Sequence, residues 1–307
     1  MPQHYHSLDA AQLNGTWLTI GVFDGVHRGH QEIIQQLTAG AHANGAPAVV
    51  LTFNPHPANV LAGRKISLLT TPDERAEILI ELGIDAVIDV AFTRELAEHS
   101  AEDFMGNLQR HLGLKQLLIG YDFALGKGRA GNFERLTLIG QELGYAVSAL
   151  PALRQEDKTI SSSMIRQDIA AGEVALAATK MGRAYTISGM VVPGDGRGRT
   201  IGIPTANVET NPEKAMPLNG VYACLAVANG KKQQAVVNIG VRPTFTNGES
   251  VPRVEAHLLN YAADLYGQTL RLEFVERLRG EQKFSSIDAL VAQIKADIDR
   301  AQLLFQG

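Results

Sequence analysis

This sequence lacks both the cysteines for a disulfide bond and the long apolar runs of a membrane span. Its 307 residues include one cysteine, Cys224, so no disulfide can form within the chain. No apolar run approaches the length of a membrane-spanning helix, and the polar residues 1–10 lack the pattern of a signal peptide. These absences predict a protein of the cytoplasm that does not contact a membrane.

An excess of positive charge is also lacking. The 28 Lys and Arg residues are outnumbered by 32 Asp and Glu residues, which gives a formal net charge of −4. Proteins that bind nucleic acid depend on Lys and Arg to neutralise phosphates, so this balance argues against a nucleic-acid partner. A small anionic substrate needs only a local group of cations. We therefore expect small-molecule partners. As a separate expectation, the protein is a monomer or weak homo-oligomer.

Two widespread enzyme motifs are absent. The sequence has no Gly-x-x-x-x-Gly-Lys-Ser/Thr, which excludes a Walker phosphate loop. It has no His-Glu-x-x-His, and apart from the histidines at 27 and 30 no Cys or His falls at ligand spacing, so the sequence disfavours zinc. The length and the apolar content of 45% indicate a globular chain of about two domains.

The first half alternates short apolar runs with helical patterns. The runs are continuous, as in strands buried on both faces, and cover residues 48–53, 86–90, 117–119 and 146–150. One helical pattern between them opens with a capping box at Thr71. The alternation predicts an α/β fold with a doubly wound parallel sheet. Ligands of such sheets bind beyond the carboxyl ends of the strands, where four candidate residues lie: Asp24, His27, His56 and Asp122.

Residues 21–30, Gly-Val-Phe-Asp-Gly-Val-His-Arg-Gly-His, follow an apolar run and precede a helical pattern. A strand, a glycine turn and a helix start together present backbone N–H groups to a phosphate. His27 and His30 flank Gly29, so both imidazoles can face one ligand that the backbone approaches closely. Histidines at this spacing also occur as metal pairs or as surface residues. The stretch resembles a signature of the nucleotidyltransferase superfamily, whose members transfer a nucleotidyl group from a nucleoside triphosphate.

Residues 159–166, Thr-Ile-Ser-Ser-Ser-Met-Ile-Arg, precede another helical pattern. Serines at such a place are good N-caps, which is the structural interpretation. In the functional one, Ser161, Ser162 and the Arg166 guanidinium hold a pyrophosphate leaving group as charge develops on it. The string resembles the second signature of the same superfamily. His56 also has two interpretations. It contacts a ligand, or it simply belongs to a loop that the two neighbouring prolines make rigid.

The second half changes to alternation with a period of two. Apolar residues alternate with polar ones around Asn229-Gly230, a type I′ hairpin signal, and again over 254–259 and 270–275. These short strands predict a small antiparallel barrel. An amphipathic helix over 287–298 closes the chain, with Ser285 as its expected N-cap.

Residues 194–207 form a run rich in glycine and arginine that ends in Pro-Thr-Ala-Asn. No βαβ pattern follows, so the glycines are not a dinucleotide fingerprint. A flap that closes over phosphates, followed by Thr205 and Asn207 as oxygen ligands of Mg²⁺, fits a kinase without a Walker loop. A mobile hairpin tip is the alternative interpretation.

Over nearly its whole length, the chain resembles the family of prokaryotic bifunctional riboflavin kinase/FMN adenylyltransferases, also called FAD synthetases. The resemblance rests on residues 21–31, 53–57, 120–131, 160–166, 194–207, 220–222, 238–245, 254–257 and 264–267. It implies a Rossmann-like adenylyltransferase domain over 1–180 and a riboflavin kinase barrel with a terminal helix over 181–307.

For the adenylyl half, the resemblance implies that an FMN phosphate oxygen attacks the α-phosphate of ATP, which yields FAD and pyrophosphate. His27, His30 and Arg166 are the implied catalytic residues. Binding of nucleotide or FMN is implied for Gly21, Phe23, Asp24, Gly29, His56, Asp122, Ser161 and Ser162. The chain departs from the family pattern at Asn54, where an acidic residue is common, and at Ala124-Leu125.

For the kinase half, the resemblance implies that the riboflavin 5′-hydroxyl attacks the γ-phosphate of a separate ATP and that Glu255 accepts its proton. Thr205 and Asn207 are the implied Mg²⁺ ligands. Binding of ATP or flavin is implied for Gly194, Arg199, Gly202, Thr205, Asn207, Arg279 and Glu281. Three alternatives stay open: an enzyme with one inactive half, a class I aminoacyl-tRNA synthetase, and a flavin or nucleotide sensor without turnover.

Overall fold

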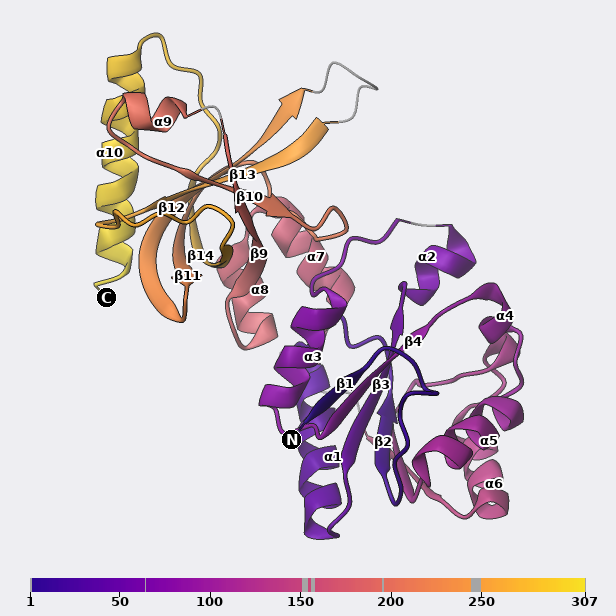
Figure 1. Ribbon diagram of the computed structural model, residues 1–307. Helices are drawn as coiled ribbons and strands as arrows, with labels where there is room; N and C mark the ends of the chain where they lie inside the picture. The colour runs from indigo at the N-terminus through magenta and orange to yellow at the C-terminus, as the bar shows by residue number, and fades with distance from the viewer. Residues whose placement is uncertain are drawn as a thin grey trace. The chain divides into compact units, whose positions relative to one another are not determined.

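The computed structural model describes residues 2–63, 65–150, 154–155, 158–194, 196–243 and 250–306. Contacts divide the chain into two compact units, Met1–Ser162 and Ser163–Gly307 (Figure 1). Residues 195, 244 and 245, which belong to segments singled out in the sequence, lie outside the described residues. The domain limits expected at 180 and 181 stay a prediction.

A six-stranded parallel sheet forms the centre of the first unit. The strand order is β1-β4-β3-β2-β5-β6, with β1 (Gln3–Tyr5), β2 (Trp17–Ile20), β3 (Ala48–Asn54), β4 (Ala86–Ala91), β5 (Gln116–Gly120) and β6 (Ala146–Leu150). The predicted parallel α/β fold is confirmed, and β1 is an edge strand that the sequence pattern did not reveal. Because β2 lies between β3 and β5, the loop after β2 opens where the order of the strands reverses, which is where such sheets bind ligands.

Helices cover both faces of this sheet (Figure 1). They are α1 (Arg28–Ala43), α2 (Pro57–Ala62), α3 (Pro72–Glu81), α4 (Arg94–Ala97), α5 (Ala101–Leu112) and α6 (Phe133–Leu143), with a short 3₁₀ turn at Lys127–Arg129. On one face, Val50 packs in a core with Ile34 and Leu37 of α1. On the other, Leu51 packs in a core with Met105 of α5. Neighbouring residues of one strand therefore serve opposite cores, which explains why the run is apolar throughout.

Two local predictions about the first unit have different outcomes. The capping box at Thr71 is confirmed, because its hydroxyl accepts a hydrogen bond from the Glu74 N–H while the Glu74 carboxylate accepts one from the Thr71 N–H. The expectation that 146–150 is buried on both faces is wrong. These residues form β6, an edge strand whose side chains are half-buried or exposed.

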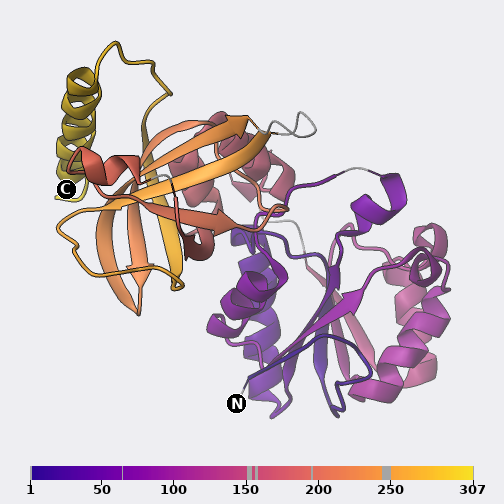
Figure 2. The ribbon, with the colours of Figure 1, turned by 45° about the horizontal axis from the view of Figure 1, so that its top comes forward.

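The second unit is a closed barrel with helices outside it (Figure 2). The strand order is β10-β13-β12-β11-β14-β9, with β9 (Tyr185–Val192), β10 (Ala206–Thr210), β11 (Gly220–Ala228), β12 (Lys231–Pro243), β13 (Ser250–Leu258) and β14 (Thr269–Arg279). The helices are α7 (Ser162–Ala171, which begins at the limit of the unit), α8 (Val174–Met181), α9 (Arg197–Thr200) and α10 (Ile287–Leu304). In the first unit, a separate ribbon pairs β7 (Arg154–Gln155) with β8 (Lys158–Thr159). The predicted antiparallel barrel with a terminal helix is confirmed.

Turn and cap chemistry in the second unit follows the sequence with one correction. Asn229 and Gly230 join β11 to β12 with φ values of 50° and 73°, as a type I′ hairpin requires. The N-cap of α10 is Ser286 and not Ser285, because the Ser286 hydroxyl accepts a hydrogen bond from the Ala289 N–H at 3.1 Å.

Aromatic side chains fill the interior of the barrel. Tyr185, Tyr222 and Phe274 are all fully buried, and the rings of Tyr222 and Phe274 meet edge to face at 5.4 Å. Burial raises the pKa of Tyr222 to about 12, and its hydroxyl donates a hydrogen bond to the Leu218 carbonyl. Burial also raises the pKa of the Cys224 thiol. Because side chains alternate along a strand, the residues between these inward-facing positions lie on the outer face of the barrel.

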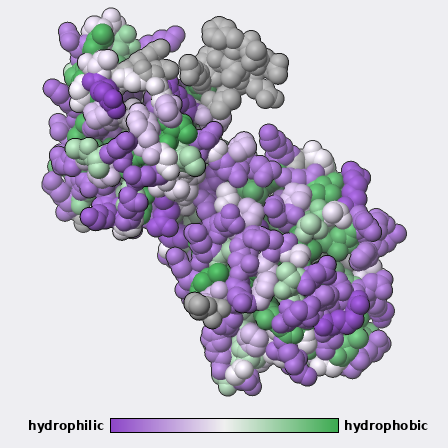
Figure 3. Space-filling view, viewed as in Figure 1, coloured by the Kyte–Doolittle hydropathy of each residue, from purple (hydrophilic) through white to green (hydrophobic). Residues whose placement is uncertain are grey.

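Hydrophilic residues predominate on the face of the molecule shown in Figure 3. None of the helices among the described residues combines the length and the hydropathy that crossing a bilayer requires.

Candidate active sites

His27 and His30 meet at the amino end of α1. His27 is the N-cap of this helix, and its Nδ1 accepts a long hydrogen bond of 3.4 Å from the His30 N–H. The two imidazoles stack with their centroids 3.7 Å apart, and the Phe23 ring meets His30 edge-on at 5.1 Å. Both imidazoles therefore lie at the amino end of a helix, whose dipole favours an anion.

The side chain of Asp24 holds the glycine turn in place through buried hydrogen bonds. Its carboxylate is buried and accepts hydrogen bonds from the Leu69 N–H at 3.1 Å and from the Thr70 N–H at 2.9 Å. The Thr70 hydroxyl completes the link, because it donates to Asp24 and accepts from the Gly25 N–H. These bonds tie the loop after β2 to the residues before α3. A nucleotide-binding role for Asp24 stays a prediction beside this structural one.

Two glycines of the turn are closely surrounded. A Cβ at Gly29 would lie 3.2 Å from the His27 ring, so a larger residue would crowd the stacked imidazoles. Gly25 has a φ of +81°, and its Cβ would lie 2.8 Å from a methyl group of Leu69. Phe23 and Val26 also have positive φ values of 50° and 37°, a conformation that is costly for them and typical of functional loops.

The other residues predicted for the adenylyl site have separate positions. Ser162 donates a hydrogen bond of 2.9 Å to the Asp24 carbonyl, so it supports the same loop. His56 follows β3 as the N-cap of α2, with Nδ1 accepting from the Ala58 N–H at 3.1 Å. Asp122 is exposed in the turn after β5, and Arg166 lies within α7. Gly21 directly follows β2, and Ser161 directly precedes α7.

A second constellation lies on the outer face of the barrel. Strand pairing places Glu255 of β13 directly beside Asn207 of β10 on one side and Asn238 of β12 on the other. The guanidinium of Arg253 binds a Glu255 carboxylate oxygen at 2.9 Å and the Asn207 Oδ1 at 3.2 Å. Sequence reasoning did not select Arg253 or Asn238, although Arg253 and Glu255 are two residues apart and so share a face.

This constellation lines a cavity of about 380 Å³ between the barrel wall and α10. Among the predicted residues, those that line it are Thr205, Asn207, Glu255, Arg279 and Glu281. Apolar surface comes from Val221, Val236 and Leu290, and Phe284 adds an aromatic ring. The lining thus combines charged and amide groups with apolar side chains, which suits a ligand with a flat apolar end and a polar end.

An ion pair that the sequence did not reveal holds α10 beside this cavity. Arg279 binds the buried carboxylate of Asp297 through Nε at 3.0 Å and through a terminal nitrogen at 2.8 Å. Gln293 donates to the same carboxylate, and the Arg279 guanidinium lies 5.7 Å from the Phe284 ring centre. The pair joins α10 to the end of β14, so its first effect is to place Phe284 and the helix.

The glycine-rich run lies against the predicted metal ligands. A Cβ at Gly194 would overlap the Asn207 amide at 2.0 Å, and one at Gly198 would lie 3.3 Å from the Thr205 hydroxyl. Gly202 has a φ of +75°. Arg199 lines a neighbouring cavity of about 640 Å³ with Thr205 and with residues 261–266. Thr205 therefore borders both hollows of the barrel.

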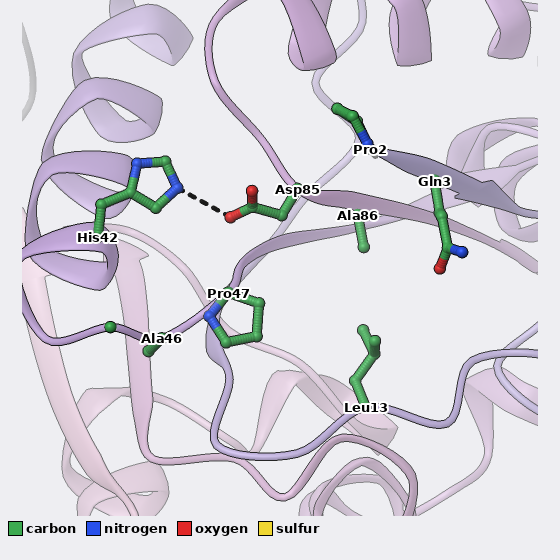
Figure 4. A pocket seen from close by; sticks show the side chains of 9 residues that line it. Pro2, Gln3, Leu13, His42, Ala46, Pro47, Asp85 and Ala86 are labelled. Carbon is green, nitrogen blue, oxygen red and sulfur yellow. Dashed lines mark hydrogen bonds and ion pairs between the residues drawn. The ribbon is translucent and has the colours of Figure 1, made fainter.

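A further hollow of about 510 Å³ lies at the amino ends of the strands in the first unit, where His42 Nε2 and Asp85 Oδ2 are 2.8 Å apart (Figure 4). Asp85 also accepts a hydrogen bond from the Ala48 N–H at 2.8 Å. This edge of the sheet is opposite the one that carries the glycine turn, so the hollow does not belong to that site.

The first unit thus has a parallel α/β sheet with two stacked histidines at a helix start, and the second has a carboxylate between two amides beside a cavity. Residues 9–164 match the FAD synthetase family, and residues 181–305 match the riboflavin kinase family.

Individual proteins show the same match over nearly the whole chain. The bifunctional riboflavin kinase/FMN adenylyltransferase of Escherichia coli strain K12 is 40% identical, with 95% of this chain and 93% of the relative covered. Its counterpart in Bacillus subtilis strain 168 is 35% identical, with coverage of 99% and 97%. A crystal structure named as a macrolide-efflux protein from Streptococcus pneumoniae superposes with a TM-score of 0.89 at 30% identity, and 98% of each chain is covered.

The chain belongs to the family of bifunctional riboflavin kinase/FMN adenylyltransferases. It is a kinase and a nucleotidyltransferase, with riboflavin, FMN, FAD and ATP as its substrates and products.

Proposed function

We propose that the barrel phosphorylates riboflavin at the cavity beside Glu255 and that the glycine turn of the first unit adenylylates the resulting FMN. The observation that carries the kinase half is the register of the barrel, which aligns Glu255 with Asn207 next to the cavity. The Glu255 carboxylate accepts the proton of the riboflavin 5′-hydroxyl as the oxygen attacks the γ-phosphate of ATP. A base on a strand of a closed barrel is held rigidly, and positioning provides most of the rate in phosphoryl transfer.

Thr205 and Asn207 are the residues that hold Mg²⁺ in this proposal. Their hydroxyl and amide oxygens are hard donors of the kind that Mg²⁺ prefers, and both line the cavity that contains Glu255. The ion supplies positive charge that offsets the charge developing on the phosphates. Thr205 also borders the cavity that Arg199 lines, so the two hollows accommodate flavin and nucleotide on either side of the transfer point.

In the adenylyl half, an FMN phosphate oxygen attacks the α-phosphate of a second ATP, and pyrophosphate leaves. The stacked imidazoles of His27 and His30, at the amino end of a helix of 16 residues, support a role in stabilising the negative transition state. Gly29 lets the backbone approach the phosphate. Ser161, Ser162 and Arg166 bind the leaving group in this proposal.

Nucleotide or FMN contacts in the adenylyl site are proposed for Gly21, Phe23, Asp24, His56 and Asp122. Those in the kinase site are proposed for Gly194, Arg199, Gly202, Arg279 and Glu281. No general base is needed for adenylyl transfer, because a phosphate monoester is already a competent nucleophile.

Incubation of the full chain with riboflavin, ATP and Mg²⁺, followed by chromatography over time, tests the proposal. FMN appears first and FAD later, with one ADP and one pyrophosphate formed for each FAD. FMN without FAD would show that the adenylyl half is inactive, and FAD only from added FMN would show that the kinase half is inactive. Light scattering of the same sample tests the expected monomer or weak homo-oligomer.

A further inference from the structure

Three side chains with the chemistry of metal ligands lie together at the edge of the first unit's sheet. His4 lies in β1, His6 follows the end of that strand, and Asp89 lies in β4, which pairs in parallel with β1. One donor atom from each of the three lies within 4.8 Å of the other two. The two imidazoles lie side by side, because their ring centres are 4.5 Å apart.

His4 lies between two carboxylates. Its Nε2 is 2.6 Å from the Asp89 Oδ2, and its Nδ1 is 3.9 Å from the Asp73 Oδ1. Histidines that bind a metal through one nitrogen usually donate a hydrogen bond to a carboxylate through the other. The exposed carboxylate of Asp73, in the first turn of α3, is suited to that second position.

Asp89 is fixed through its other oxygen. The buried guanidinium of Arg75 donates to the Asp89 Oδ1 at 3.1 Å, which leaves Oδ2 directed toward His4. The ion pair with Arg75 is enough to explain why the Asp89 carboxylate is buried here. It does not explain why a second imidazole lies close by, with the centre of the His6 ring 4.5 Å from that of His4.

We infer that His4, His6 and Asp89 bind one divalent transition-metal ion of the Zn²⁺ type, with Asp73 and Arg75 as the outer hydrogen-bonding partners. Two imidazoles and one carboxylate are a ligand set that favours such ions over Mg²⁺. His6 is exposed, so the ion has a path from solvent, and a water molecule completes the coordination. The bound ion links the edge strand β1 to β4. This site is separate in its residues from both proposed reactions.

Calorimetric titration of the metal-free full chain with zinc chloride tests this inference. We expect one site in the wild-type chain and an affinity at least about tenfold weaker in His6→Ala, because loss of one ligand removes a third of the set. His6 is exposed, so this variant keeps its fold, which circular dichroism checks. Magnesium chloride is expected to give no binding that depends on His6.

Two further variants control for zinc bound elsewhere. His99→Ala removes an exposed imidazole outside the cluster and is expected to bind zinc as the wild type does. His30→Ala disrupts the stacked pair at the glycine turn and is expected to keep the His6-dependent site. Equal zinc affinity in the wild type and His6→Ala, or loss of the only tight site in His30→Ala, would overturn the inference.

Discussion

In the first unit, the two imidazoles of the proposed adenylyl site come from a single stretch of ten residues, whereas the polar groups of the proposed kinase site come from several strands of the barrel. His27 and His30 are adjacent on one helical turn, and local bonds around Asp24 hold their loop. Asn207, Glu255 and Asn238 are far apart in the sequence and meet only through strand pairing. One site is fixed by neighbours along the chain and the other by the register of a closed barrel.

This difference determines how each site can fail. A shift of one residue in β13 would turn Glu255 toward the barrel interior and Val254 or Ala256 toward the cavity. The closed barrel prevents that shift, because β13 is paired on both sides. The glycine turn is not held by strand pairing. It depends instead on a few buried hydrogen bonds and on glycine at two positions.

The largest expected effect comes from Glu255→Gln, which removes the proposed base and keeps the size of the side chain. FMN formation is expected to fall by about 10²- to 10⁴-fold, the range for loss of a positioned acid or base. FAD formation from supplied FMN is expected to persist, since the glycine turn is unchanged. Chromatographic assays of each reaction measure both rates. Glu209→Gln, at an exposed position of β10, is the matched control and leaves both rates unchanged.

His30→Ala tests the comparison from the other side. FAD formation from FMN is expected to fall by about 10²- to 10³-fold, as when one preorganised donor to a transition-state charge is removed. FMN formation in the barrel is expected to continue at the wild-type rate. A parallel fall of both activities, in this variant or in Glu255→Gln, would contradict the assignment of two separate sites.

Asp24→Asn tests whether the glycine turn depends on its buried carboxylate. The amide places an NH₂ group opposite backbone donors, so one buried donor loses its acceptor, and we expect a loss of about 1–3 kcal/mol in unfolding free energy. FAD formation is expected to decrease while FMN formation persists below the unfolding temperature. Urea unfolding and the two assays measure these effects, and unchanged stability would show that Asp24 does not anchor the loop.

Arg253→Gln is expected to have the smallest effect. The Arg253 pair with Glu255 is only partly buried, and such pairs contribute roughly 0.2–1 kcal/mol. Arg253 also occupies the Asn207 oxygen proposed for Mg²⁺, so its removal is expected to lower the half-saturating Mg²⁺ concentration for FMN formation by about 1.4- to 5-fold. A higher Mg²⁺ requirement in the variant would show that Arg253 assists the ion and does not compete with it.

Much of the site in the first unit could be predicted because its chemistry is local. The spacing of His27, Gly29 and His30 on a helix start already indicates that the imidazoles converge. What the local pattern could not show is that Asp24 binds the segment before α3, since Leu69 and Thr70 are more than forty residues away in the sequence. Their N–H groups reach the Asp24 carboxylate only once the chain has folded and the segment before α3 lies against the glycine turn.

The sequence by itself determined the two folds, because the continuous apolar runs demand a sheet covered on both faces and the alternating runs demand a one-sided strand. It also determined the strand faces, and with them the exposure of Glu255. Only the tertiary structure decided which strands pair with β13, that Asp297 of α10 meets Arg279, and that Asp89 lies beside His4. These contacts join residues distant in the sequence, and their geometry follows from barrel closure and sheet order, which no local periodicity specifies.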